Sequence, residues 1–307
     1  MFEYVNINNM SIGYHVSRSD RKGKKCEYSK SLKEFIDDMN GYGFRDLCAQ
    51  IFVSGPQTFN KPTVSESDYA NIRDLTRKDL KLVAHAAYVS NPWKMSPGAI
   101  HNVREELRLC DKIGALGLVL HLSAAAFEYE TLKFVLEKIS SGLEIEQPKI
   151  LWLEINAAKR SDFTYETPEK INSLFEKINK VKTEIDLGKL SISLCVDSSH
   201  LFSLGCSLAD YSVAEKWLSE LPDIPNLMFH LNDSKSELGS GVDRHEALLK
   251  GKIWSEYHPV TGRLGIESSG LLSILNFATE NNSIVILERG EGLEQDLFLI
   301  SSLNYFQ

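Results

Sequence analysis

Eight short apolar runs, separated by segments with helical periodicity, constrain the fold of this chain more than any other feature. Most of the runs are rich in Val, Ile and Leu and lack clean alternation of polar and apolar residues. Such runs are typical of strands that are buried on both faces of a parallel sheet. The runs are Ile12–Ser17, Leu47–Val53, Lys81–Ala87, Leu116–Leu122, Lys149–Ile155, Ile192–Asp197, Asn226–Asn232 and Ser283–Arg289.

Helical patterns fill the spaces between these runs. Segment 96–117 begins with Ser96 as a candidate N-cap and Pro97 at the first helical position. Segment 167–181 repeats this plan, and segment 29–43 ends on glycines that can stop a helix. Each segment carries an apolar stripe that would face a core. The stripes are Leu32, Phe35, Ile36 and Met39; Ile100, Val103, Leu107 and Cys110; and Ile171, Leu174, Phe175 and Ile178.

Eight strands, each followed by a helix or a long loop, predict an α/β fold of the (β/α)₈ type, the TIM barrel. We expect one such domain over residues 1–307. An open doubly wound sheet is the alternative, but it should show a glycine-rich nucleotide-binding turn after an early strand. The sequence has neither GxGxxG nor GxxxxGK[ST], which favours the barrel.

Composition narrows the class of protein further. A hydrophobic content of 43% in 307 residues is enough for a large core, and no apolar run reaches the ~18 residues of a membrane span. The five cysteines are scattered without a CxxC pair, which argues against a thiolate zinc site and a disulfide framework. A net charge of −8 weighs weakly against a nucleic-acid partner, although bound cations would cancel several charges. We expect a monomeric intracellular protein, in the cytoplasm or nucleus.

Histidines and carboxylates gather at the ends of the apolar runs and in the loops just after them. A single such residue at a strand end is more often structural, because it can bond a carbonyl or cap a helix. A whole group of them at one end of a barrel would place like charges together, a conflict that divalent cations resolve. The residues are His85, His121, Glu154, Asp197, His200, His230, Asp243, His245 and Glu288.

This set of ligands predicts a metal centre. Histidine with carboxylate and no thiolate suits zinc, manganese or iron. A site usually takes about four ligands, so a set of this size fits two or three ions better than one. Asp197 and His200, one helical turn apart, can serve neighbouring ions, and Asp243 and His245 share a side of an extended segment.

The motifs at these positions resemble those of the endonuclease IV family. They are HAAY, HLS, LE at Leu153–Glu154, VDSSH, HLND, GSGVDRH and ILER, in this order along the chain. The resemblance extends from GYHVS near residue 13 to Glu288. It implies a barrel with three zinc ions that cuts duplex DNA 5′ to an abasic site, leaves a 3′-hydroxyl and acts in base-excision repair. Manganese or iron could replace zinc at one site.

The resemblance also assigns the ligands. It implies that one zinc is held by His85, His121 and Glu154. Glu154 would bridge to a second zinc, which Asp197, His230 and Glu288 complete. The third zinc would take His200, Asp243 and His245. His15 matches a family histidine near the site that is not a ligand, and Asp233 is expected to be structural.

Several positions depart from the family pattern. EINAAK stands where ENTAG is usual, Ala86–Ala87 replaces a proline-containing pair, and Arg289 follows Glu288 where a threonine is usual. Gln57 stands near the place of an arginine that wedges into DNA. These changes spare the ligands and affect the contacts that distort DNA. With NPW after HAAY, and with GKIW, they resemble the branch found in large cytoplasmic DNA viruses, which implies a viral factory or virion as the location.

Two metal ions can clamp the attacking and leaving oxygens of a phosphodiester displacement and activate the attacking water. Glu154 or Glu288 would orient this water or accept its proton. Loop residues after the strands are candidates for contacting DNA, although Trp93 could equally pack against a helix and Arg244 could hold a loop acid. These candidates are Gln57, Tyr88, Asn91, Trp93, Lys94, Lys235 and Arg244.

A sugar isomerase or epimerase on the same kind of barrel is the strongest rival hypothesis. Those enzymes also gather glutamate, aspartate and histidine at strand ends, around one or two manganese or magnesium ions. The third set, His200 with Asp243 and His245, favours the nuclease because a dinuclear isomerase does not need it. An inactive DNA-binding relative is disfavoured because every ligand of the family pattern is present.

Overall fold

Eight parallel strands form the centre of the molecule. The computed structural model describes residues 10–19, 21–55, 57, 64–157, 164–289 and 292–303. The strands are paired in the order β1-β10-β7-β6-β5-β4-β3-β2. Each of the eight predicted runs overlaps one of these strands, although the first strand begins at Ser11 and the sixth at Leu190, before the predicted runs begin. The strands are β1 (Ser11–Tyr14), β2 (Cys48–Phe52), β3 (Lys81–His85), β4 (Gly117–His121), β5 (Lys149–Glu154), β6 (Leu190–Asp197), β7 (Met228–His230) and β10 (Ile284–Leu287).

The sheet closes on itself between its two outer strands. Parallel bridges join Ile12 to Leu47 and His15 to Gln50, so β1 meets β2. A Cβ atom on Gly13 would lie 1.8 Å from the carbonyl oxygen of Cys48, so only glycine permits this approach. The predicted barrel is therefore confirmed, and the alternative of an open doubly wound sheet is wrong.

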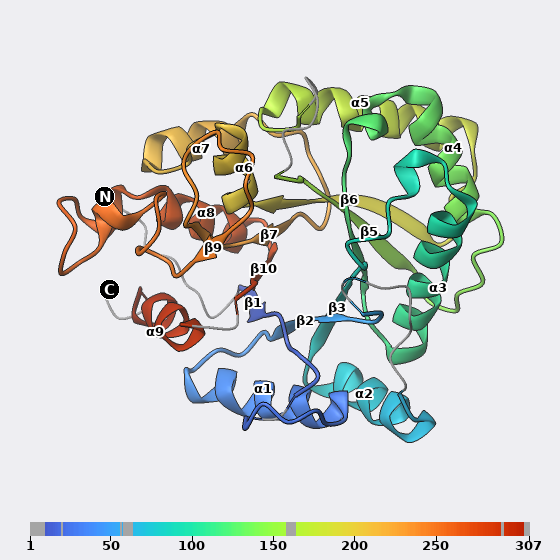
Figure 1. Cartoon of the computed structure of the whole chain (residues 1–307), viewed down its shortest axis with the longest axis horizontal. Coiled ribbons are helices and arrows are strands. Elements are labelled where there is room, and N and C mark those ends of the chain that lie inside the picture. Colours follow the sequence, from blue (N-terminus) through green and yellow to red (C-terminus); the bar gives the residue numbers. More distant parts are fainter. Residues whose placement is uncertain are drawn as a thin grey trace.

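Helices surround the barrel (Figure 1). Three of them, α1, α3 and α5, correspond to the segments predicted from their apolar stripes. Both α3 and α5 begin with a proline directly after the expected cap residue, Ser96 or Thr167. In the described part of the chain, no helix is both long and apolar enough to cross a membrane. The helices are α1 (Tyr28–Gly41), α2 (Glu66–Lys78), α3 (Pro97–Ile113), α4 (Tyr129–Ser140), α5 (Pro168–Glu184), α6 (Ser198–Leu204), α7 (Tyr211–Ser219), α8 (Gly270–Glu280) and α9 (Leu293–Leu303).

Two short strands and several 3₁₀ turns lie in the loops. The strands β8 (Asp233–Ser234) and β9 (His245–Glu246) pair antiparallel in the loop that follows β7. Single 3₁₀ turns follow β3 and β4 at η2 (Pro92–Lys94) and η3 (Ala124–Phe127). Two more, η4 (Ser255–Tyr257) and η5 (Ile266–Ser268), precede α8.

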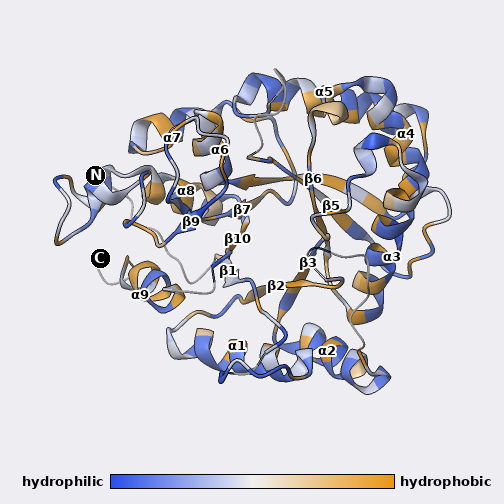
Figure 2. Ribbon diagram, viewed as in Figure 1, coloured by the Kyte–Doolittle hydropathy of each residue, from blue (hydrophilic) through white to orange (hydrophobic). Residues whose placement is uncertain are grey.

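The sheet separates two apolar cores. The outer core lies between strands and helices and includes the predicted stripes, of which only Ile36 is partly exposed. Figure 2 shows hydrophobic residues along the strands and on one side of each surrounding helix. The inner core fills the barrel below the strand ends. It consists of Cys48, Val83, Val119, Trp152, Cys195, Met228, Ile284 and Ile286.

Candidate metal centre

A polar layer lies directly above the inner core. Side chains two residues apart on a strand point to the same face, about 7 Å apart. Two residues after an inner-core residue on each of seven strands comes a polar residue of the candidate site. The pairs are Cys48–Gln50, Val83–His85, Val119–His121, Trp152–Glu154, Cys195–Asp197, Met228–His230 and Ile286–Glu288. The same alternation along the strands therefore places both the inner core and the polar layer above it.

The first candidate ligand group is His85, His121 and Glu154. The Nε2 atoms of both histidines lie 3.0 Å from Oε2 of Glu154, which is fully buried. The other ring nitrogen of His85 lies 2.7 Å from the carbonyl oxygen of Ala86. A proton on that nitrogen leaves Nε2 free to bind a cation, as in many metal sites.

The second group is Glu154, Asp197, His230 and Glu288. Nδ1 of His230 lies 3.2 Å from Oε1 of Glu154 and 3.2 Å from Oε2 of Glu288. Asn232 donates to Oδ2 of Asp197 at 2.8 Å and accepts from the backbone N–H of Glu288 at 3.1 Å. Glu154 thus faces two groups at once, as the family resemblance implies for a bridging ligand.

The third group joins the end of β6 to the β8–β9 hairpin. Asp197 caps α6 by accepting from the backbone N–H of His200 at 2.8 Å, and Nδ1 of the His200 ring lies 2.6 Å from the carbonyl oxygen of Ile155. The ligand atoms of Asp197, His200 and His245 lie within 4.8 Å of one another. Asp243, expected as the carboxylate of this group, lies 3.3 Å from Nε2 of His200 and 3.0 Å from Nε2 of His245. The structure therefore brings a second shared carboxylate, Asp197, into the group.

Proton affinities in the centre reflect opposite charges packed together. Burial alone would raise the pKa of Glu154, but His121 and His230 hold it well below its usual range. Burial would lower the pKa of His245, yet Asp197 and Asp243 raise it to about 9. Without a metal, Asp197 and Asp243 thus favour the charged form of His245.

The donor set fits divalent cations. The three groups present imidazole nitrogens and carboxylate oxygens, the donors that zinc, manganese and iron accept. Nε2 of His245 is buried without a hydrogen-bond partner of good geometry, although Asp243 lies 3.0 Å away. An unsatisfied buried nitrogen facing carboxylates is what an absent cation would leave.

Two site residues escaped the sequence analysis. Gln50 is fully buried and contacts His230 and Glu288. Its signal was an amide inside the apolar run Leu47–Val53, on the face that Cys48 also occupies. Asn232 lies within the HLND motif, but the sequence did not show that its side chain joins Asp197 to the backbone of Glu288.

A cavity of about 260 Å³ opens beside the ligand groups. Tyr88, 55% exposed, contacts the rings of Phe52, His85 and His121 from the loop after β3. The tyrosine therefore lies where a substrate would reach the centre. The cavity is lined by His15, Phe52, Tyr88, Asp243, His245 and Glu288.

The remaining candidates for DNA contact differ in exposure. Trp93 is 1% exposed and donates from Nε1 to the carbonyl oxygen of His121 at 2.8 Å. This burial leaves little surface for a contact with DNA, because Trp93 packs in the outer core and supports a ligand-bearing strand. Asn91 is half-buried, and Nζ of Lys235 lies 3.8 Å from Oε2 of Glu246. The candidates with exposed side chains are Gln57, Tyr88, Lys94, Lys235 and Arg244.

Two other expected residues support the site without joining a ligand group. Asp233 is buried and accepts from the backbone N–H groups of Ser234 and Ile253, which fits its predicted structural place. Arg289, the departure after Glu288, turns to Asp296 at 2.8 Å and to Glu246 at 3.5 Å. It thereby connects the strand that ends before Glu288 to β9 and α9.

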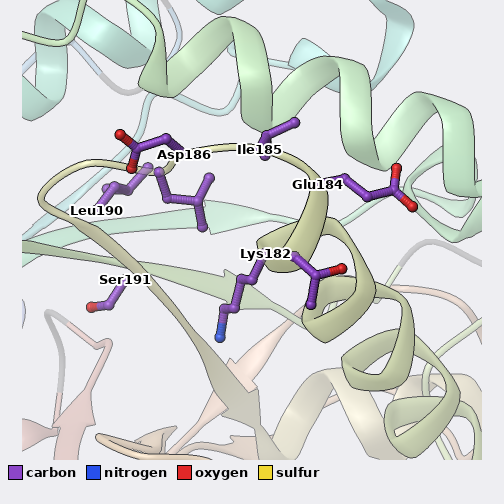
Figure 3. A pocket seen from close by; sticks show the side chains of 8 residues that line it. Lys182, Glu184, Ile185, Asp186, Leu190 and Ser191 are labelled. Carbon is purple, nitrogen blue, oxygen red and sulfur yellow. The ribbon is translucent and has the colours of Figure 1, made fainter.

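A larger cavity lies elsewhere and does not resemble a reaction centre. Its volume is about 630 Å³, and residues 182–187 with Leu190 and Ser191 line it. These residues precede or begin β6, so the cavity lies at the opposite end of the barrel from Asp197. The carboxylates of Glu184 and Asp186 point in different directions (Figure 3). Convergent ligands thus identify the smaller cavity as the candidate site.

Known proteins are similar to this chain in sequence and fold. Residues 41–282 match the family described as xylose isomerase-like TIM barrel. The chain is 32% identical over 276 residues to a probable AP endonuclease of African swine fever virus, with 88% of each chain covered. The crystal structure of AsfvAP:AG is similar with a TM-score of 0.83 at 31% identity, covering 96% of this chain and 99% of that one. Endonuclease IV from Thermus thermophilus shares the fold, with a TM-score of 0.65 at 21% identity and coverage of 96% and 98%.

Proposed function

The chain belongs to AP endonuclease family 2, and from this premise we propose that it hydrolyses the phosphodiester 5′ to an abasic site in duplex DNA. The product would carry a 3′-hydroxyl, and the reaction would serve base-excision repair. The observation that supports this most is the set of three adjoining ligand groups, two of which share Glu154. The monomeric state, the single domain and the intracellular location stay predictions.

We assign the centre to three zinc ions, with manganese or iron as alternatives at one position. His85 and His121 would hold the first ion with Glu154, and Glu154 would reach the second. Asp197, His230 and Glu288 would complete the second. His200, His245 and Asp243 would hold the third, with Asp197 close enough to contribute. When bound, such ions polarise a phosphodiester and a water molecule and neutralise the charge that develops on the leaving oxygen.

The two glutamates have different surroundings and hence different roles. Glu288 lines the cavity and is 12% exposed, so its carboxylate can contact a water or substrate that enters. Glu154 is fully buried among histidines and cannot contact the substrate directly. We therefore propose Glu288 as the residue that orients the attacking water and accepts its proton, and Glu154 as a bridging ligand.

Recognition of the lesion would depend on the cavity and the loops around it. An abasic site lacks a base to unstack, so turning its sugar out of the duplex costs less than for an intact nucleotide. Tyr88, which lines the cavity, would contact that sugar. Exposed Lys94, Lys235 and Arg244 would meet phosphates, and Gln57 would take the place of a wedge residue.

Cleavage of a short duplex with one abasic site tests this function. Its intact twin is the substrate control, and gel analysis identifies the product ends. We expect cutting only at the lesion, with a 3′-hydroxyl; an unsaturated 3′ aldehyde would indicate a lyase instead. Protein shown to carry its full metal load that cuts neither duplex would contradict the proposal and favour a sugar isomerase or epimerase.

A substitution at the exposed edge of the centre tests the ligand assignment. Asp243→Ala should lower the metal content by about one ion and abolish cutting, because Asp243 contacts both histidines of the third group. Asp223→Ala, an exposed acid before β7, is the matched control and should leave both unchanged. Full activity of Asp243→Ala with the ion missing would refute the assignment.

A further inference from the structure

Gln50 lies in the polar layer as its uncharged member. Its side chain is fully buried in the middle of β2, on the same face as Cys48. Nε2 of Gln50 lies 2.6 Å from Oε1 of Glu288 and 3.3 Å from Nδ1 of His15. Oε1 of Gln50 lies 2.9 Å from Nε2 of His230. One amide thus contacts two candidate ligands from different strands and a third residue that lines the cavity.

These contacts determine which way the amide points. An ionised carboxylate only accepts hydrogen bonds, and Glu288 would be ionised as a ligand of the second group. The group that faces Glu288 must therefore be the NH₂ of Gln50. The carbonyl oxygen then faces His230, so Nε2 of His230 must carry a proton and donate it. The second amide hydrogen points to His15, whose Nδ1 must accept.

The consequence for His230 sets it apart from two other histidines of the centre. In His85 and His200, Nδ1 lies close to a backbone carbonyl oxygen, at 2.7 and 2.6 Å, and Nε2 faces carboxylates. In His230 the order is reversed, and Nδ1 faces Glu154 and Glu288. No backbone carbonyl needs to hold the proton of His230, because the side chain of Gln50 does.

We propose that Gln50 is a positioning residue, which fixes the protonated nitrogen of His230 and the carboxylate of Glu288 so that both face the second ligand group. This inference rests on the proposed metal centre, but not on DNA cleavage. Residues that orient ligands typically change metal affinity by about 10–100-fold when they are replaced. Because the amide of Gln50 donates to Nδ1 of His15, the proton of the His15 ring is held on its other nitrogen, Nε2.

The test compares Gln50→Leu with Cys48→Ala. Leucine has a similar size but no hydrogen-bonding group, and Cys48 lies below Gln50 on the same strand face without belonging to a ligand group. Zinc affinity is measured by competition with a chelator, and the protonated ring nitrogens are identified by long-range ¹H–¹⁵N spectra. We expect Gln50→Leu to lose about 10-fold or more in affinity for one ion, and His15 to show both tautomers.

Cys48→Ala should keep the wild-type zinc affinity and histidine spectra. Wild-type affinity and an unchanged His230 signal in Gln50→Leu would overturn the proposal, and so would an equal loss in Cys48→Ala. If Gln50→Leu does not fold, Gln50→Glu keeps the size and the acceptor oxygen. It should preserve the His230 tautomer but weaken zinc binding, because a carboxylate then faces Glu288; wild-type affinity would overturn the role of the donor.

These readouts separate the inference from the proposed activity. The tautomer of His15, which is not a candidate ligand, reports the orientation of the Gln50 amide with or without zinc. A protein that binds zinc and shows the expected tautomers but does not cut abasic DNA would uphold Gln50 and refute the endonuclease.

Discussion

The barrel interior holds two layers of side chains that come from the same strands but differ in polarity and charge. The lower layer, represented by Trp152 and Met228, is apolar and fully buried. The upper layer, represented by Glu154 and His230, is ionisable and almost as deeply buried. Two residues along a strand separate them. Stability and chemistry therefore share the same strands, but they can be disturbed separately.

The lower layer stabilises the fold against the free-energy cost of burying the charged groups of the upper layer. Burying carboxylates and imidazoles costs free energy unless each is paired, and pairing needs fixed geometry. Close packing of Trp152 and its neighbours stabilises the barrel as a whole, and the barrel's strand ends bring the charged groups to contacts of 3.0–3.6 Å. The apolar layer stabilises the fold, and the polar layer uses its rigidity.

The largest effect should come from removing the carboxylate shared by the first two groups. Glu154→Gln keeps the shape but loses the charge, so we expect the loss of more than one ion and a fall in kcat/KM by roughly three orders of magnitude or more. Metal analysis and abasic-site cleavage measure both. The fold should persist by circular dichroism, since the lower layer is intact. An unfolded Glu154→Gln protein would show that the layers are not separable.

A cavity in the lower layer should instead lower the stability and leave metal binding unchanged. Trp152 is fully buried, and Trp152→Ala should lower the free energy of unfolding by about 3–5 kcal/mol. Denaturant titration measures this loss. At temperatures where the variant stays folded, its zinc stoichiometry should match the wild type. Trp152→Phe is the milder control, and loss of zinc from a folded Trp152→Ala protein would contradict the separation.

A smaller effect should appear as a pH dependence of the metal-free protein. Asp197 and Asp243 raise the pKa of His245 to about 9 against burial, from 6.5 in an unfolded chain. The folded state holds this proton more tightly, so the stabilisation is complete below pH 6.5 and is lost as the pH rises through 9. We expect the free energy of unfolding to fall over that window by roughly 3 kcal/mol.

The affinity for zinc should instead increase with pH, because zinc binds neutral imidazole and the protons must leave first. Thermal denaturation of the metal-free protein between pH 6 and 9 measures how the stability depends on pH. The control is His245→Gln. Equal slopes in the wild type and His245→Gln would show that His245 does not carry the effect.

The sequence was sufficient to predict the strands and the candidate ligands because both depend on position along one strand. An apolar run such as Leu116–Leu122 ends in His121, and parallel strands in a barrel all end on one face. The relation between Asp197 and His200 also follows from local geometry, since one turn of helix separates them.

Contacts between distant segments could not be predicted in the same way. Trp93 follows a ligand strand and could have faced solvent; its burial depends on packing with the strand that ends at His121. Gln50 joins residues 180 and 238 positions away in sequence, so only the closed barrel reveals its partners. Asp197 entered the third group because the β8–β9 hairpin returns His245 toward it, which spacing alone does not specify.

The sharing of Glu154 and Asp197 between groups limits how such a centre can change by mutation. A change at either residue would alter two ligand groups at once, so single steps there would not yield descendants that lack one group alone. Asp243, at the exposed edge, contacts the third group alone. Evolutionary loss or exchange of an ion would therefore begin at that edge, and the buried pair of carboxylates would be the last part to diverge.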